Sequence, residues 1–426
     1  MKEEIQKKVV LDNGLTFLFV PYRGINSVYL DLSTNTGALN ESLDEIGVAH
    51  LLEHMVFQGT KNFPTVKALN SPLYKIGAYF NGSTDIDLVA YYATVVNNMS
   101  HIKTALRFLY EITENPLLRE KDLEKERKII YDEILRGEKH PYYKFNDELF
   151  KKIYPNNQRI AFPTAGYKHN ISAITLKQIK RYWEENYGAK NFVLSICGDL
   201  NFDDIFPIVE KTFSKKRAGE QRQNAKSHLF KKEFVYSLLD KKLKHPSLKI
   251  SFEAYPRSHR LNPAIKVMDS ILSGGSKSRL FNSIREKNGL AYACRTGYGV
   301  SENIGRFYFS VEAEEKNMNQ IIQIIKKEIQ RITTKKVTDE EMEFEKADIS
   351  TSYLLSMDDP TKRLGFYYWN ERYKENLTPL LAYKKLRGVT KEEVLEAAKY
   401  IFSQPVGIGM VSNTIKKDEL ENMWFS

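Results

Sequence analysis

Two histidines and a glutamate lie close together near the start of the chain, in the run His50-Leu-Leu-Glu53-His54. Histidines four residues apart project from the same face of a helix, so both imidazoles can bind one metal ion. Glu53 lies on the same side, where its carboxylate can accept a proton from a water molecule without binding the metal itself. The spacing therefore predicts a zinc site that carries its own general base. Two surface histidines on an ordinary helix are the alternative.

A catalytic zinc ion usually has three protein ligands and one open position, so a third ligand is expected elsewhere. Residues 121–137 have a helical period and end at a glycine typical of a helix C-terminus. Their apolar stripe, which includes Leu123 and Ile130, also contains Glu126 and Glu133. Carboxylates on a buried face are costly unless they are paired, hydrogen-bonded or bound to a metal. Metal binding explains this placement; glutamates at the edge of the stripe that contact water are the alternative.

The run 50–64 resembles the signature of the pitrilysin/insulinase family of zinc metallopeptidases, which includes the mitochondrial processing peptidase. Its H-x-x-E-H order is that of the inverzincins. Residues 126–133 are similar to the helix that supplies the family's third ligand. The resemblance implies Glu53 as general base and Glu126 as an acid that supports the metal ligands. It also implies one Zn²⁺ per chain, held by His50, His54 and Glu133.

Residues 77–95 are typical of a turn followed by a strand rich in aromatic and β-branched residues. The family resemblance implies that part of this segment is an edge strand that binds an extended peptide substrate. That part comprises Phe80, Asn81, Gly82, Ser83 and Thr84. Main-chain hydrogen bonds hold a peptide regardless of its side chains, which suits broad specificity, and Asn81 is expected to contact the substrate. An ordinary strand with a Gly-Ser bulge is the alternative.

Residues 274–292 resemble a family element in which an arginine and a tyrosine reach the active site from the opposite side of a closed chamber. The resemblance gives these roles to Arg285 and Tyr292. Arg285 would hold substrate carbonyl or carboxylate groups by charge-assisted hydrogen bonds. Tyr292 would donate a hydrogen bond to the oxyanion that develops as water attacks the scissile carbonyl. The Gly-Gly-Ser-Lys-Ser run at 274–278 lacks the order of a phosphate-binding loop, so we discard that interpretation.

The composition is that of a folded globular protein, with 42% hydrophobic and 28% charged residues. The net charge of +10 raises the question of nucleic acid or an anionic membrane as a partner. Lysines and glutamates are mixed along most of the chain, however, and the basic run 215–226 has no aromatic residues or apolar face. We therefore expect neither nucleic acid nor membrane as a partner. Cys197 and Cys294 are expected to be two buried thiols, and a cytoplasmic location is expected because no signal-like or 18-residue apolar segment is present.

The order of expected elements repeats in the two halves of the chain. Strand-like segments at 15–20 and 248–252 are each followed by a helix, at 46–58 and 262–272. The second of these helices has no histidine, so only the first half is expected to hold zinc. The resemblance implies an α+β fold of two duplicated α/β-sandwich domains of the processing-peptidase type. We expect the boundaries 1–214 for the zinc-binding catalytic domain, 215–230 for a basic linker and 231–426 for the second domain, which contributes Arg285 and Tyr292.

Half-length members of the family pair to form the chamber that longer members build within one chain. This chain has both the zinc motif and the Arg/Tyr element, so the resemblance implies a homodimer whose active sites are shared between subunits. The expected function is that of a zinc-dependent endopeptidase or oligopeptidase that hydrolyses peptides or unfolded segments inside a closed dimeric chamber. The alternative is a non-catalytic peptide-binding or assembly subunit with the same fold.

Overall fold

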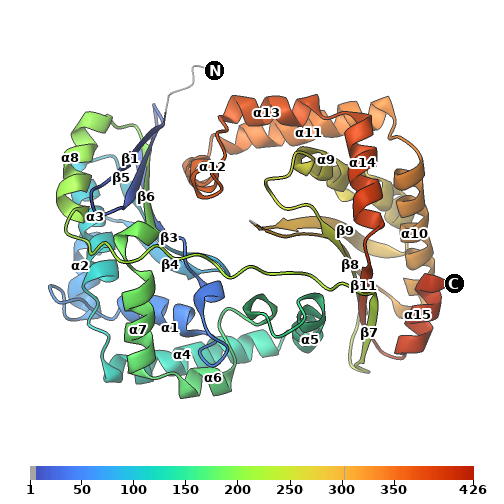
Figure 1. Cartoon of the computed structure of the whole chain (residues 1–426), viewed down its shortest axis with the longest axis horizontal. Helices are drawn as coiled ribbons and strands as arrows, with labels where there is room; N and C mark the ends of the chain where they lie inside the picture. The colour runs from blue at the N-terminus through green and yellow to red at the C-terminus, as the bar shows by residue number, and fades with distance from the viewer. Residues whose placement is uncertain (1–5, 302) are drawn as a thin grey trace. The chain divides into compact units, whose positions relative to one another are not determined.

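The computed structural model describes residues 6–301 and 303–426. Two compact units account for this chain, and neither is continuous in sequence (Figure 1). Unit 1 comprises residues 6–137, 162–225 and 357–375. Unit 2 comprises residues 138–161, 226–356 and 376–426. A single division of the chain at residues 215–230 would place residues 138–161 in unit 1 and residues 357–375 in unit 2. The structure places each of these two segments in the other unit.

Unit 1 is built on a six-stranded mixed sheet with the order β1-β2-β6-β3-β5-β4. β2 pairs with β6 in parallel, and the other neighbouring pairs are antiparallel. All seven residues of β6 are buried, which suits a central strand, whereas β4 lies at the edge. The strands are β1 (Lys7–Val10), β2 (Thr16–Pro21), β3 (Ser27–Thr34), β4 (Tyr79–Thr84), β5 (Val89–Val96) and β6 (Phe192–Gly198).

Helices cover both faces of this sheet, because its buried strands carry apolar side chains on each side. On one face, Phe17 and Phe19 of β2 belong to the main core formed with the helices of the unit. On the other face, Leu18 and Val20 pack against helix α12. The helices are α1 (Val48–Val56), α2 (Val66–Lys75), α3 (Met99–Glu114), α4 (Glu120–Glu138), α6 (Lys168–Ala173), α7 (Leu176–Asn186), α8 (Phe202–Phe213) and α12 (Pro360–Arg372), with short 3-10 turns at Ala38–Asn40 and Ala189–Asn191.

A buried ion pair holds the end of α12 on the unit 1 sheet. The guanidinium of Arg372 lies 3.1 Å from the carboxylate of Asp87 and donates a hydrogen bond of 2.6 Å to its carbonyl oxygen. Only 7% of the Arg372 side chain is exposed, so this contact is shielded from solvent. Asp87 and Arg372 are far apart in the sequence, so this ion pair joins α12 to the N-terminal part of unit 1.

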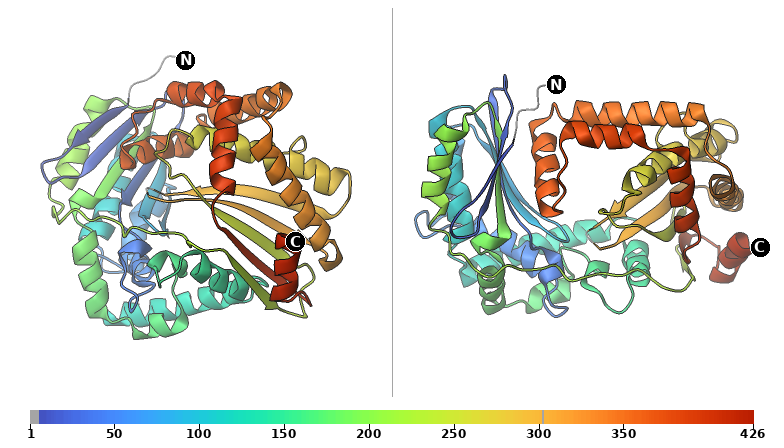
Figure 2. Two further views of the ribbon diagram at one scale, coloured as in Figure 1. Left: turned by 45° about the vertical axis from the view of Figure 1, so that its right-hand side comes forward. Right: turned by 45° about the horizontal axis from the view of Figure 1, so that its top comes forward.

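Unit 2 has a five-stranded sheet with the order β7-β11-β8-β10-β9. Figure 2 shows strands of this sheet side by side, in colours from yellow to red. β7 and β11 are parallel, and the remaining pairs are antiparallel. This order and these directions match those of β2-β6-β3-β5-β4 in unit 1, but no described strand in unit 2 takes the position of β1. The strands are β7 (Phe234–Leu239), β8 (Ser247–Ala254), β9 (Ala291–Val300), β10 (Gly305–Ala313) and β11 (Val406–Ser412).

Two helices flank the β7 end of the unit 2 sheet on opposite faces. α5 packs on β11 where Gly409 has no side chain; a Cβ atom there would lie 2.6 Å from Leu149 of the helix. α15 contacts β7 and α10, and its Leu420 is buried in the core on the other face. The helices are α5 (Tyr143–Ile153), α9 (Asn262–Ser273), α10 (Met318–Thr334), α11 (Asp339–Ser356), α13 (Pro379–Gly388), α14 (Lys391–Phe402) and α15 (Lys417–Phe425), with a π-helical turn at Phe281–Glu286 and 3-10 turns at Arg159–Ala161 and Glu315–Asn317.

The basic segment after α8 has no helix or strand until β7 begins. Its Lys216 is buried, lies 3.1 Å from the carboxylate of Glu114 and sits over the ring of Phe192. This lysine therefore packs into unit 1 rather than facing solvent. Cys197 and Cys294 are both free thiols, as expected, although Cys294 is only half-buried. Among the described residues, no helix has the length and apolar character that a membrane crossing requires.

Candidate metal centre

Helix α1 presents the two histidines because its apolar residues face the core. The buried side of the helix comprises Val48, Ala49, Leu51, Leu52, Met55 and Val56. His50 and His54 lie on the remaining side, with their ring centroids 4.8 Å apart. The first turn is capped by Glu41, whose carboxylate accepts hydrogen bonds of 2.9 Å from the backbone N–H groups of Gly47 and Ala49. The two imidazoles are therefore held by a capped, well-packed helix.

Helix α4 brings Glu133 to the histidine pair. The Oε2 atom of Glu133 lies 3.8 Å from the Nε2 atoms of both His50 and His54. One ligand atom from each of the three residues falls within 4.8 Å of the others. Two imidazoles and one carboxylate in this arrangement form a donor set that suits zinc and leaves a fourth position open. The three residues therefore fit a metal ion.

Glu126 contacts one histidine of the pair, His54, at its Nδ1 atom. Its Oε2 atom lies 3.1 Å from Nδ1 of His54, and only 3% of its side chain is exposed. A metal-binding histidine usually donates its other ring N–H to a carboxylate in this way, which leaves Nε2 free for the metal. The burial also excludes the alternative that Glu126 sits at a solvated edge of the stripe. Glu133 is more open, with 34% of its side chain exposed.

Glu53 lies beside the histidines but does not join their cluster. Glu53 is 8% exposed, and its Oε2 atom accepts a hydrogen bond of 2.9 Å from the hydroxyl of Thr84 on β4. Burial raises the pKa of Glu53, although the Thr84 hydrogen bond opposes the shift. Gly82 lies against the same carboxylate: a Cβ atom at this position would be 2.8 Å from Oε1. Strand β4 thus touches Glu53 at two places.

The predicted edge strand is present, and it forms one wall of a cavity of about 540 Å³ over the histidines. It pairs with β5 in a regular register from Tyr79–Thr94 to Thr84–Val89, so the alternative of a bulge is wrong. Residues 77–95 contain two strands rather than the single strand expected. The cavity is lined by His50, Glu53, His54, Phe57, Gln58, Asn70, Phe80, Asn81, Gly82, Ser83, Thr84, Glu126 and Glu133.

Asn70 lines this cavity, and nothing in the sequence pointed to it. It lies on α2 and is 8% exposed, yet its Oδ1 atom has no hydrogen-bond partner among the described residues. A buried carbonyl oxygen without a partner is costly, so a group that donates to it is expected in the complete site. The sequence signal is weak because Asn70 stands between Leu69 and Ser71 as an ordinary polar residue of an amphipathic helix.

Family models match most of the chain. The insulinase model of peptidase family M16 matches residues 23–162, which contain both histidines, Glu53 and Glu133. The model of the peptidase M16 inactive domain matches residues 173–348. This chain belongs to the insulinase peptidase family M16. Its mixed α/β architecture is the one that solved M16 peptidases share.

Relatives of this M16 chain carry the name zinc protease and have not been characterised. One from Rickettsia felis is 28% identical over 403 residues, which covers 92% of this chain and 94% of the relative. Another, from Bacillus subtilis, is 24% identical over 411 residues and covers 95% of this chain and 98% of the relative. In both cases the similarity extends over nearly the whole length.

Solved structures share the fold at low sequence identity. A protease from Helicobacter pylori superimposes with a TM-score of 0.85 at 18% identity, covering 96% of this chain and 99% of that one. The periplasmic protease PqqL from Escherichia coli gives a TM-score of 0.85 at 17% identity, covering all of this chain and 50% of PqqL. The M16 chain therefore corresponds in length to half of PqqL.

Arg285 and Tyr292 of the M16 chain lie in unit 2, whereas the histidine cluster lies in unit 1. Arg285 is part of the π-helical turn, and Tyr292 is the second residue of β9, with 79% of its surface exposed. The guanidinium lies 4.6 Å from the centre of the Tyr292 ring and donates a hydrogen bond of 3.4 Å to the Tyr292 carbonyl oxygen. The structure therefore brings these two residues together.

The two histidines of this M16 site have opposite electrostatic surroundings. Burial and the neighbouring His54 lower the pKa of His50 to about 4, so its imidazole is neutral at pH 7. Burial also acts to lower the pKa of His54, but the Glu126 hydrogen bond and nearby carboxylates outweigh it and raise the pKa. The Nδ1 atom of His50 is buried with no hydrogen-bond partner among the described residues. A neutral imidazole is the form that binds a metal.

Proposed function

We propose that this protein is a zinc-dependent endopeptidase or oligopeptidase. The observation that carries the proposal is the convergence of His50, His54 and Glu133 on one point, with Glu53 beside them. The zinc protease names of relatives from several bacteria support the same reaction class. Residues that could do this chemistry meet at one cavity, and that cavity has a strand edge on which a peptide can lie.

One Zn²⁺ per chain would be held by the two histidines and Glu133. When bound, zinc polarises the scissile carbonyl and lowers the pKa of its water. Glu126 fixes the ring of His54 through Nδ1, so this imidazole presents Nε2 to the metal without rotation. Lys125 lies 3.6 Å from the other oxygen of Glu126 and places a positive charge beside that buried carboxylate.

Glu53 acts as the general base. It accepts a proton from the attacking water and then passes a proton to the leaving amine. Burial raises the pKa of this carboxylate, which strengthens it as a base for the first of these proton transfers. Thr84 donates to one oxygen of Glu53 and so keeps the carboxylate from rotating between the two transfers.

Strand β4 binds the substrate as an added strand. Its outer edge is free among the described strands, so an extended peptide can pair with its main chain over Phe80–Thr84. Tyr79, Asn81 and Ser83 are exposed on one face, whereas the alternate residues face the helices. Main-chain pairing accounts for binding without strict side-chain preference, and the Asn81 amide is available to the substrate.

Arg285 and Tyr292 would complete the site from a second subunit. The chain has both the histidine cluster and the Arg/Tyr pair, so a homodimer forms two equivalent composite sites around a closed chamber. The matching strand orders of the two units support an origin by duplication, with residues 215–230 as the connection between the two domains. The two free thiols are consistent with a reducing, cytoplasmic location.

One specific observation favours a second candidate function. The model that matches residues 173–348 is described as an inactive domain, so a non-catalytic peptide-binding or assembly subunit is the alternative. Mapping of peptide-library cleavage by mass spectrometry, with zinc content measured in parallel, separates the two. Cleavage by the native chain that disappears in Glu53→Gln, while zinc is retained, supports the enzyme. Stoichiometric zinc without cleavage of any peptide supports the binding subunit.

A mixing experiment tests the shared site. Glu53→Gln and Arg285→Ala chains are each expected to be inactive alone. Subunit exchange between them would produce dimers in which one of the two sites has intact residues from both chains. Partial recovery of activity is expected; a mixture that stays inactive after exchange has been verified by mass spectrometry would rule out sharing between subunits.

A further inference from the structure

The sheet of unit 2 has an open edge at β7. Among the described strands, β7 pairs only with β11, and an edge strand directs the N–H and C=O groups of alternate residues away from its single neighbour. In unit 1 the corresponding strand, β2, is covered by β1 in antiparallel pairing. The same fold thus holds one more strand in unit 1 than in unit 2, and the position beside β7 is where it would lie.

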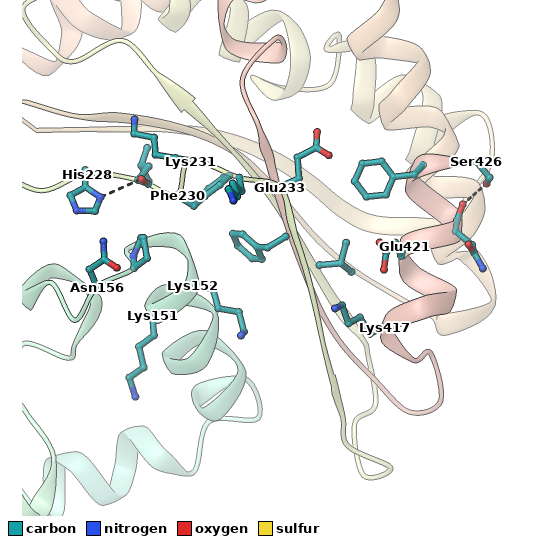
Figure 3. Close-up of a pocket in the computed structure, with 17 residues that line it drawn as sticks. Lys151, Lys152, Asn156, His228, Phe230, Lys231, Glu233, Lys417, Glu421 and Ser426 are labelled. Atoms are coloured by element: carbon teal, nitrogen blue, oxygen red, sulfur yellow. Dashed lines mark hydrogen bonds between the residues drawn. The ribbon is translucent and has the colours of Figure 1, made fainter.

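A groove of about 1350 Å³ lies at the beginning of β7 (Figure 3). Side chains of α5 form one wall and side chains of α15 form the other. The two walls belong to opposite faces of the sheet: Tyr236 stacks on Phe145 of α5, whereas Ser237 donates a hydrogen bond to the carbonyl oxygen of Ile415, just before α15. A strand added beside β7 would therefore be covered on both of its faces.

The groove is positively charged and partly apolar. It is lined by five lysines and only two glutamates, namely Lys151, Lys152, Lys231, Lys232, Lys417, Glu233 and Glu421. Asp147 pairs with Lys151, and Glu253 pairs with Lys231. In the part of the chain that the structure describes, Lys152, Lys232 and Lys417 have no carboxylate within 4.0 Å, although the Nζ atom of Lys152 lies 5.1 Å from the centre of the Tyr236 ring. Phe234 and Phe425 add apolar surface to the groove, and 48% of Phe425 is exposed.

We propose that this groove binds an extended acidic segment of another polypeptide, which adds to the sheet as a strand beside β7. Main-chain hydrogen bonds to the open edge supply the pairing, as in other cases of strand addition. Carboxylates of the ligand face Lys152, Lys232 and Lys417, the three lysines without a carboxylate partner, and its apolar side chains contact Phe234 and Phe425. By analogy with β1 and β2, the added strand runs antiparallel and covers four to six residues.

The site is separate from the histidine cluster, and the proposal does not depend on peptide hydrolysis. Lysines next to a sheet edge can also serve only to prevent pairing between copies of a protein. That simpler role does not require a groove with walls on both sides. If the lysines only prevent pairing, an acidic peptide would bind through charge alone, without main-chain hydrogen bonds. A change in the peptide backbone therefore distinguishes this role from strand addition.

The first experiment measures the fluorescence anisotropy of a labelled peptide, Glu-Glu-Val-Glu-Glu-Val, which presents glutamates on both faces of a strand. It is mixed with the full-length Glu53→Gln chain, which cannot cleave it if hydrolysis depends on Glu53. Two further peptides are N-methylated either at the odd-numbered or at the even-numbered residues. A strand that pairs on one side uses the N–H groups of alternate residues only. One of the methylated peptides is therefore expected to bind like the parent and the other to lose binding by about tenfold or more. Equal binding by all three would overturn strand addition.

The second experiment changes the protein. The double substitution Lys152→Glu with Lys417→Glu reverses two of the charges that have no carboxylate partner and is expected to weaken binding of the parent peptide by about tenfold or more. Lys327→Glu with Lys399→Glu makes the same change in net charge at exposed positions outside the groove and should leave binding within about twofold. Equal loss in both double variants would refute the site. Sedimentation without peptide tests a second copy as the occupant: self-association that disappears only in the groove variant, together with no peptide binding, would also refute it.

Discussion

Gly82 is expected to be required for the position of the general base, because it has no side chain where β4 passes over Glu53. A Cβ atom built at Gly82 would lie 2.8 Å from Oε1 and 3.1 Å from Cγ of Glu53, and 3.0 Å from the ring of Phe57. Ordinary contacts begin at 3.4 Å, so Gly82→Ala requires a shift of about 0.6 Å. The strand is held to β5 along its whole length, whereas the carboxylate is the end of a flexible side chain. The carboxylate is therefore the group that moves.

The expected cost of Gly82→Ala falls on catalysis rather than on folding. Misplacement of a reacting group by about 1 Å can cost on the order of a hundredfold in rate, so a shift of about 0.6 Å should lower kcat/KM by roughly ten- to a hundredfold. This corresponds to about 1.4–2.7 kcal/mol of transition-state stabilisation. The backbone change itself does not favour unfolding, because replacing glycine by alanine restricts the unfolded chain.

The assay compares Gly82→Ala with Ser83→Ala, a neighbour whose side chain is exposed on the opposite face of the strand. Steady-state cleavage of a fluorogenic peptide gives kcat/KM, and elemental analysis gives the zinc content of each variant. Ser83→Ala should retain activity within about threefold, and both variants should bind zinc fully. If Gly82→Ala cleaves as fast as the native chain, the tight contact with Glu53 does not position the base and the reasoning fails.

Three further predictions concern the support of the site and the sheet beneath α12. Glu126→Gln should weaken zinc binding by about 10–100-fold, measured by competition with a chelator, because His54 loses its ionic partner; unchanged affinity would contradict this. Thr84→Val should lower kcat by about tenfold at unchanged zinc content, whereas Thr84→Ser should restore it, because only the hydroxyl holds Glu53. Burial raises the pKa of Asp31 from 3.8 to about 7, so the folded protein keeps a proton that the unfolded chain releases, and stability falls as pH rises from about 4 to 7. Chemical denaturation should therefore show Asp31→Asn to be more stable than the native chain at pH 8, by on the order of 4 kcal/mol, and this advantage should vanish near pH 4.

Sequence periodicity predicted the helices of the site because both of them carry an apolar stripe against the core. α1 and α4 lie within one to two residues of the expected ranges 46–58 and 121–137. Periodicity did not separate β4 from β5, because residues 85–88 contain no glycine or proline and their two aspartates alternate with apolar residues as in a strand. Hydrophobic patterns report which face of an element is buried, and they carry no information on where the chain reverses unless a turn residue marks the place.

Long-range placement was also beyond the sequence. α12 stands in the second half of the chain, yet its apolar residues Leu364 and Tyr367 pack on Val20 and Cys197 of the unit 1 sheet. An amphipathic stripe requires an apolar partner but does not specify which sheet supplies it. The place of Asn70 in the cavity and the contact of Thr84 with Glu53 could not be predicted for a related reason. Their importance depends on the atoms they meet, a cavity wall and a carboxylate, which come from other elements.

The spacing of Glu126 and Glu133 explains why one helix can serve the histidine pair twice. Seven residues make almost two turns, so the side chains lie on one face about 20° apart around the axis. Glu126, the more buried of the two, contacts Nδ1 of His54. Glu133, the more exposed, faces Nε2 of both histidines, so one helix contacts both nitrogens of the His54 ring. Moving either carboxylate by one residue would rotate it by about 100° away from the imidazoles. The supporting acid and the third ligand are therefore parts of one helical pattern, and neither can be relocated along α4 without losing the site.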